Sequence, residues 1–299
     1  MCIVTTANAN NCPDSSSSSC SLSNEELNYC KVLTNSYSNY EQLFYDIAID
    51  DTLISDKVDG HFYQVMYGMF LYPYIYSKHM HGEGVKLMEI GLGCTQAYGT
   101  GASVNLWERL LTLGKNRNGE SQNSQYSGNG VLGDSIWEAE VLTDCVYHHL
   151  ENTTSLHRDM LNLMLGDQGD VDTLHTWISG SGGEFDIIID DGSHRQHDIY
   201  TSFNILFREA LKPGGYYFIE DLHVSRVSGW YADIDTERRV VMIEVIKDWI
   251  EQLVATVVPD DYIMRYKYKI PPKVKWIFCQ HEACVIAKCE LNDKTPNCV

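Results

Sequence analysis

Residues 185–194 read FDIIIDDGSH, an apolar run that ends in two aspartates and a turn. A short apolar run bounded by turn residues is typical of a strand buried on both faces of a parallel sheet. Similar runs lie at 85–90, 136–141, 161–165 and 216–219. Segments with a helical pattern lie between them, at 102–113, 172–178 and 197–210. Strands that alternate with helices predict an α/β fold with a mostly parallel sheet covered on both faces.

The last part of the chain predicts one more helix and two more strands. Apolar residues between Met242 and Val257 recur at three- and four-residue steps, which predicts a helix with one buried face. Residues 274–290, VKWIFCQHEACVIAKCE, read as two strands around a turn at Gln280–Glu282. The predicted fold is therefore a Rossmann-like, doubly wound, mostly parallel seven-stranded sheet with a C-terminal antiparallel hairpin and an N-terminal helical cap.

The chain divides into segments of different composition. Residues 1–23 are rich in Ser and Asn and predict a disordered tail. Residues 24–80 are dense in aromatic side chains and predict the helical cap, which is open to being a lid or a dimer contact in a homo-oligomer. The main domain is expected at 81–290, with a flexible polar insertion at 112–135 and a short tail at 291–299.

Charge and composition exclude several classes of function. The chain has 22 basic and 41 acidic residues, a net charge of −19, which disfavours nucleic-acid binding and favours cationic ligands or metal ions. No apolar stretch is long enough to span a membrane, and the first residues do not resemble a signal peptide. The ten cysteines are scattered without a CxxC pair, so we expect no structural zinc, mostly reduced thiols and a cytoplasmic location.

Candidate ligand-binding residues follow the predicted strands. In open α/β sheets, ligands bind beyond the carboxyl ends of the strands. Carboxylates stand at all five of these ends, in the segments 89–93, 138–140, 166–170, 190–194 and 220–221. One acidic residue at the start of a loop is as often a helix cap or a solvated group, but five together favour a binding site.

Single positions suggest what is bound there. The glycines of Gly91–Gly93 let a ligand approach the backbone, while Gln96 stands where a dinucleotide fingerprint needs a third glycine. A carboxylate in the segment Glu138–Glu140 can accept hydrogen bonds from both hydroxyls of a ribose. Asp167 or Gln168 is placed to meet the edge of an adenine.

The most informative group is Asp191, His194, Glu220 and Asp221. If the strands before them are neighbours, about 4.8 Å apart, these side chains converge. Three carboxylates brought together raise one another's pKa unless a cation neutralises them, and hard oxygen ligands suit Mg²⁺, Ca²⁺ or Mn²⁺. A lone histidine here is as often structural, but beside such a cluster His194 is a candidate general base.

Five motifs together resemble a known family. They are LMEIGLG at 87–93, WEAE at 137–140, GDQGD at 166–170, FDIIIDDGSH at 185–194 and LKPGGYYFIED at 211–221. They resemble class I S-adenosylmethionine-dependent methyltransferases and are most similar to the macrocin and mycinamicin-type metal-dependent O-methyltransferases. The resemblance covers about 50–230. It implies methyl transfer to a hydroxyl of a small molecule that is a sugar, a diol or catechol-like.

The resemblance also implies roles for individual residues. The expected cofactor-binding residues are Glu89, Gly91 and Gly93 on the methionine side, Glu140 at the ribose, Asp167 and Gln168 at the adenine, and Asp190 near the sulfonium. Asp191, Glu220 and Asp221 are the expected ligands of Mg²⁺ or another divalent cation, and His194 is the expected base. Asp56-Lys57, His61 and Tyr63 match the family's TDK…HxY segment, which helps to close the cofactor site.

Two other classes of function compete with this one. A non-catalytic Rossmann-like protein that binds a nucleotide or cofactor and acts through a partner would keep the sheet and lose the site, which the intact group around His194 argues against. A nicotinamide-dependent oxidoreductase is disfavoured by the missing third glycine. The expected partner is a small-molecule acceptor, with no nucleic acid and no membrane.

Overall fold

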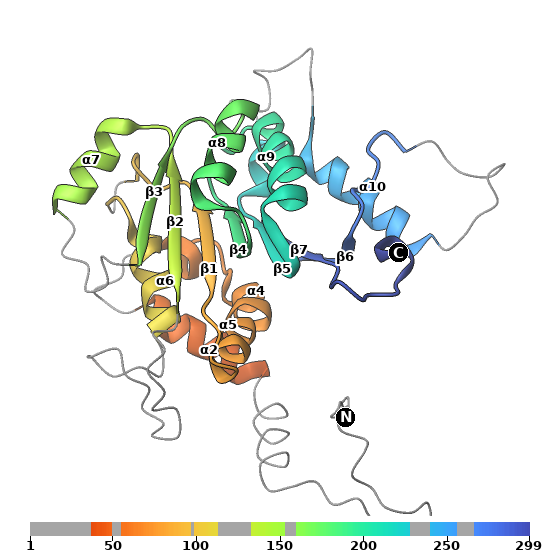
Figure 1. Ribbon diagram of the computed structural model, residues 1–299, viewed down its shortest axis with the longest axis horizontal. Coiled ribbons are helices and arrows are strands. Elements are labelled where there is room, and N and C mark those ends of the chain that lie inside the picture. Colours follow the sequence, from red (N-terminus) through yellow and green to blue (C-terminus); the bar gives the residue numbers. More distant parts are fainter. Residues whose placement is uncertain are drawn as a thin grey trace, which may run out of the picture.

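The computed structural model describes residues 37–49, 55–96, 99–112, 133–152, 160–227, 240–255 and 266–299. Its centre is a seven-stranded sheet in the order β3-β2-β1-β4-β5-β7-β6 (Figure 1). The strands are β1 Lys86–Ile90, β2 Ser135–Glu140, β3 Leu161–Leu165, β4 Phe185–Asp190, β5 Leu211–Ile219, β6 Val274–Cys279 and β7 Cys284–Lys288. The first five strands are parallel, and β7 pairs antiparallel with both β5 and β6. The predicted fold class is confirmed.

Helices cover both faces of the sheet (Figure 1). One face packs against α8 Val171–Ser181, α9 Gln196–Glu209 and α10 Met242–Val254. The other packs against α2 Tyr37–Ala48, α3 Asp56–Asp59, α4 Gln64–Met66, the π-helical turn η2 Tyr67–Leu71, α5 Tyr72–Met80 and α6 Ala102–Thr112. The remaining helices of the described residues are α7 Thr143–Asn152 and the 3-10 turns η4 Leu222–Arg226 and η7 Pro296–Cys298. Every residue of β4 is buried because helices lie on both sides of it.

The aromatic side chains of the N-terminal helices belong to the main core. Tyr67 is fully buried, and its ring lies 5.1 Å from that of Phe44, 5.3 Å from that of Trp107 and 5.0 Å from that of Phe218. The described part of the predicted cap, from 37 to 80, is therefore one helical layer of the sandwich. The division of the chain into domains stays a prediction. The tail at 1–23 and most of the insertion at 112–135 lie outside the described residues.

Two local expectations differ from the structure. The strand expected at 216–219 begins earlier, at Leu211, so β5 includes Pro213–Gly215. The pairing of β4 with β5 shifts register between Phe185 and Ile187, next to this segment. Helix α7 was not predicted, because its sequence TDCVYHHLEN is mostly polar, and among residues 143–149 Val146 alone is fully buried. No helix among the described residues is long and apolar enough to cross a membrane.

The expectation of reduced cysteines is wrong for all six that the structure describes. They form the disulfides Cys94–Cys145, Cys279–Cys284 and Cys289–Cys298. The first joins residues 51 apart in the sequence, and the second joins partners that face each other across the β6–β7 hairpin. The predicted hairpin already brings Cys279 close to Cys284, whereas nothing in the sequence spacing shows the first proximity. Closing the 51-residue loop is worth about 4 kcal/mol in the chain-entropy account.

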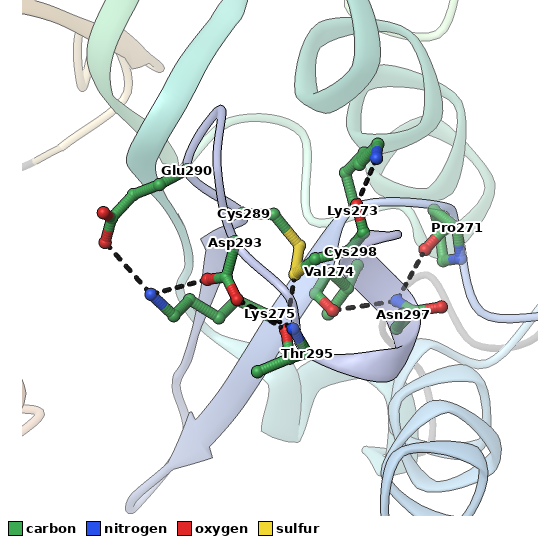
Figure 2. Close-up of a disulfide and its surroundings, with 10 residues drawn as sticks. All are labelled: Pro271, Lys273, Val274, Lys275, Cys289, Glu290, Asp293, Thr295, Asn297 and Cys298. Carbon is green, nitrogen blue, oxygen red and sulfur yellow. Dashed lines mark hydrogen bonds and ion pairs between the residues drawn. A yellow bond between two sulfur atoms is a disulfide. The ribbon is translucent and has the colours of Figure 1, made fainter.

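The third disulfide ties the predicted tail at 291–299 back to the sheet (Figure 2). Nearby, Lys275 Nζ lies 2.7 Å from Asp293 and 3.0 Å from Glu290, and the Asn297 amide donates to the carbonyl of Val274 at 2.8 Å. The end of the chain is thereby anchored on β6.

Candidate functional site

The sheet brings the ends of β4 and β5 together. The strands are hydrogen-bonded neighbours with Asp190 opposite Ile219, so Asp191 and Glu220 follow at the same edge. The Asp191 N–H donates to the carbonyl of Ile90 at 3.0 Å, which also ties the loop after β4 to β1. Three predicted loops therefore meet at one point.

Asp191, His194 and Asp221 form the first cluster at this edge. They offer ligand atoms that all lie within 4.8 Å of one another. His194 Nε2 lies 3.4 Å from Asp221 Oδ2, and both side chains are mostly buried. His194 and Asp221 have left-handed backbones, with φ of 54° and 53°. Such strained conformations in residues other than glycine cost about 1–3 kcal/mol each and gather at functional sites.

A buried lysine neutralises the acids behind this cluster. Lys57 Nζ lies 2.8 Å from Glu220, 3.0 Å from Asp191 and 3.5 Å from Glu89, and the lysine side chain is only 2% exposed. Burial by itself would lower the pKa of Lys57, but the three carboxylates hold it well above its usual value. The lysine is therefore charged and fixes the acids in place.

Two tyrosines position the acids that follow β5. The Tyr67 hydroxyl donates to the Glu220 carboxylate, whose other oxygen accepts from Lys57. The Tyr63 hydroxyl donates to Asp221 Oδ1 at 2.8 Å and accepts from the Asp221 N–H at 3.1 Å. Glu220 thus faces the interior, whereas Asp221 faces His194. The predicted segment 56–63 does lie against the candidate site.

His61 approaches the carboxylate oxygen of Asp221 that His194 does not. Its Nδ1 lies 2.7 Å from Glu282 Oε2 and 3.4 Å from Asp221 Oδ1. Burial opposes protonation of His61, but the hydrogen bond with Glu282 and the charges of Asp221 and Asp56 raise its pKa above the usual value. Neither Glu282 nor the adjacent His223 was predicted as a site residue. The turn between β6 and β7 reaches the end of β5, where the Leu222 N–H donates to the Glu282 carbonyl, and no sequence spacing signals this.

The turn after β1 requires its first glycine. Gly91 has a φ of 109°, and a Cβ at this position would lie 2.2 Å from the carbonyl oxygen of Asp191. Gly93 is also left-handed, with a φ of 72°. Glu89 lies beneath this turn, fully buried, and accepts from Ser103 Oγ at 2.6 Å and from the Trp107 indole at 2.9 Å. The turn and the acidic cluster are thus in direct backbone contact.

The predicted ribose and adenine residues stand at the ends of β2 and β3. Glu140 Oε1 accepts from the N–H groups of Val141 and Leu142, at 2.8 and 3.0 Å, which orients the carboxylate. Asp167 accepts from the Gly169 N–H at 2.8 Å.

Gln168 and Asp190 lie inside the domain. The Gln168 amide donates to Asp190 at 2.9 Å and accepts from the Ser193 N–H at 2.7 Å, and Asp190 also accepts from Ser202 and Tyr217. Their polar atoms are engaged with one another, so their contacts with a cofactor stay predictions. What the geometry does show is that they hold the loop carrying Asp191 and His194.

A carboxyl group outside the cluster gives a pH-dependent prediction. Glu138 is completely buried beside Glu89, its partner in the β1–β2 register. Burial raises the pKa of Glu138 well above its usual value, and Glu89 raises it further. The folded chain therefore holds a proton that the unfolded chain loses above pH about 4.3, so stability falls as pH rises past that point.

Glu138→Gln needs no proton and is expected to raise the melting temperature at pH 8, with a gain that shrinks towards pH 4.5. Thermal denaturation across this range measures it. The matched control is Glu251→Gln, at a side chain that is 46% exposed. A gain that does not depend on pH would contradict the protonated state of Glu138.

The fold of the chain is similar to that of solved methyltransferases. The MycE methyltransferase from the mycinamycin biosynthetic pathway, solved in complex with Mg and SAH, superimposes with a TM-score of 0.56 at 20% identity, over 86% of this chain and 55% of that one. No protein-family model matches the chain.

Sequence relatives point in the same direction. The chain is 28% identical over 192 residues to demethylmacrocin O-methyltransferase of Streptomyces fradiae. The aligned segment covers 62% of this chain and 40% of that enzyme. The chain is 39% identical over 161 residues to 8-demethyl-8-(2-methoxy-alpha-L-rhamnosyl)-tetracenomycin-C 3'-O-methyltransferase of Streptomyces olivaceus, covering 54% and 33%. The chain thus spans about 40% or less of the length of these curated relatives. The resemblance to macrocin and mycinamicin-type O-methyltransferases is confirmed.

Proposed function

We propose that this chain transfers the methyl group of S-adenosylmethionine to a hydroxyl of a small molecule such as a sugar, a diol or a catechol-like compound. The observation that carries the proposal is the meeting of Asp191, His194 and Asp221 at the carboxyl edge of the sheet, against the Gly91 turn. The names of the relatives, which are O-methyltransferases of sugar-bearing compounds, support it.

The cofactor is proposed to lie across the strand ends. The backbone of Gly91–Gly93 would face its methionine part, Glu140 its ribose, and Asp167 the adenine. Glu89, Gln168 and Asp190 would support these loops from inside, since their polar atoms are engaged there.

The donor set suits a hard divalent cation such as Mg²⁺. Asp191 and Asp221 offer carboxylate oxygens beside each other. Glu220 is the proposed third ligand, and it would exchange one of its present partners, Lys57 or Tyr67, for the ion. A bound divalent ion would fix two adjacent hydroxyls of the acceptor and lower the pKa of the attacking one. The Lys57 ammonium keeps the acids together, and the MycE structure with Mg supports the assignment.

His194 is proposed as the general base. As the acceptor oxygen attacks the methyl carbon, the carbon–sulfur bond breaks, S-adenosylhomocysteine leaves, and the acceptor proton passes to the imidazole. Asp221 Oδ2, 3.4 Å from His194 Nε2, would orient the ring.

The proposal is tested by ligand binding and turnover together. S-adenosylhomocysteine is expected to raise the melting temperature, whereas NAD is not, because only a ligand of the folded state stabilises it. A labelled methyl group should then appear on a member of a panel of sugars and vicinal diols. Stabilisation by NAD alone would overturn the proposal. Stabilisation by S-adenosylhomocysteine without transfer to any acceptor would favour the non-catalytic alternative.

The compartment and the assembly stay predictions. The three disulfides argue against the cytoplasmic location expected from the sequence, because disulfides persist mainly in oxidising compartments. The N-terminal aromatic region offers less exposed apolar surface for a contact between subunits than the sequence suggested, because Phe44, Tyr63 and Tyr67 are buried in the core.

A further inference from the structure

A second group of metal-ligating side chains lies beside the carboxylate oxygen of Asp221 that His194 does not approach. His61 comes from the segment after α3, His223 from η4, and Glu282 from the turn between β6 and β7. Ligand atoms of His61, Asp221 and Glu282 all lie within 4.8 Å of one another. His223 Nδ1 lies 3.5 Å from Glu282 Oε2. His61, Asp221 and Glu282 come from three separate parts of the chain and converge, and His223 lies beside Glu282 at the edge of this group.

Two of the three contacts have the separation expected of ligands on a shared cation. Ligand atoms about 2.0–2.1 Å from one ion, at tetrahedral angles, lie about 3.4 Å apart. His61 Nδ1 lies 3.4 Å from Asp221 Oδ1, and His223 Nδ1 lies 3.5 Å from Glu282 Oε2.

A hydrogen bond accounts for the 2.7 Å contact of His61 with Glu282, but it does not account for His223. The His223 Nδ1 atom is buried and makes no hydrogen bond with any residue that the structure describes. It is nevertheless directed at the same carboxylate oxygen as His61. A cation between them would satisfy this nitrogen.

We propose that His61, His223, Glu282 and Asp221 form a second divalent-cation site, distinct from the one assigned to Asp191, Glu220 and Asp221. A mixed imidazole and carboxylate set favours a transition-metal ion such as Mn²⁺ or Zn²⁺ over Mg²⁺. Asp221 is shared: Oδ1 faces His61 and Oδ2 faces His194, each at 3.4 Å. A carboxylate that bridges two ions is the arrangement of two-metal sites.

The site would join three parts of the fold. An ion held here ties the N-terminal segment that carries Lys57 and Tyr63 to the C-terminal hairpin and to the loop after β5. It would also fix the orientation of Asp221. The proposal does not depend on methyl transfer, because it concerns binding alone.

The second cation site is tested by counting the bound Mn²⁺ ions by EPR on the chelator-treated 299-residue chain. Mn²⁺ is chosen because thiols, which prefer softer metals, compete for it poorly. We expect two ions per chain in the wild type and one in the double variant His61→Ala, His223→Ala. The Asp191→Asn variant should keep the second ion, and His281→Ala, at a side chain that is 63% exposed next to Glu282, should bind as the wild type does.

Two results would overturn the second site. The first is a double variant that binds as many ions as the wild type, with an affinity reduced less than tenfold. The second is a wild type that binds a single ion which only Asp191→Asn removes. Circular dichroism checks that each variant is folded, and His223→Ala alone, at a side chain that is 38% exposed, provides a milder variant with the same expected direction. Failure of methyl transfer would not affect either count.

Discussion

Replacing His194 by alanine is expected to lower the rate of methyl transfer by about 10²–10⁴-fold, the usual contribution of a general base. Asp191→Ala is expected to abolish turnover, because it removes a proposed cation ligand. Affinity for S-adenosylhomocysteine should change little in both, since the cofactor is expected over β1, β2 and β3 and these side chains follow β4. Calorimetry with S-adenosylhomocysteine alongside a labelled methyl-transfer assay measures the two effects separately.

His175→Ala is the matched control for these variants. Its side chain is 51% exposed on α8 and lies 3.6 Å from Glu209, away from the cluster. It should retain wild-type turnover. Full activity in His194→Ala would contradict the assignment of the base, and a parallel loss of cofactor affinity would indicate a structural role instead.

Replacing Lys57 by methionine is expected to destabilise the fold by about 3–5 kcal/mol, the usual effect of removing one partner from a buried ion pair. The change leaves Glu220 and Glu89 fully buried without their cation, and Asp191 partly so. Urea denaturation at pH 7 measures the loss. The control is Lys247→Met, at a side chain that is 72% exposed and lies 4.0 Å from Glu251.

A second variant separates charge from packing. Adding Glu220→Gln to Lys57→Met should recover part of the lost stability, because one uncompensated charge is removed. The cost of Lys57→Met should also be smaller at pH 5 than at pH 8, as unpaired carboxyls in the interior take up protons more readily. A loss below about 1 kcal/mol, or strict additivity of the two changes, would show that the lysine does not hold the acids together.

The sheet could be predicted from the sequence because its strands carry their own signals. The run at 161–165 ends at Gly166-Asp167 and forms β3 over that same range. Once the strands are located, the acidic residues that follow them can be read directly from the sequence. Because the carboxyl ends of parallel strands lie at one edge of the sheet, these acids are expected at that edge. Their meeting at Asp191 and Asp221 follows from the pairing of β4 with β5.

Features that depend on contacts between distant segments could not be predicted. The pairing of β7 with β5 places Glu282 beside Asp221, and no local pattern records it. Burial of Lys57 runs against the usual exposure of lysine and follows only from the acids around it. The Cys94–Cys145 disulfide joins the turn after β1 to α7, a helix that its polar sequence concealed.

The central claim is that Asp191 and Asp221 gather around one divalent cation beside His194. The most direct test is a crystal soaked with Mn²⁺ and S-adenosylhomocysteine, viewed in an anomalous difference map. The account predicts a peak within coordination distance of Asp191 and Asp221, with the cofactor sulfur facing it. A map with the cofactor bound and no peak between these two carboxylates would contradict the account.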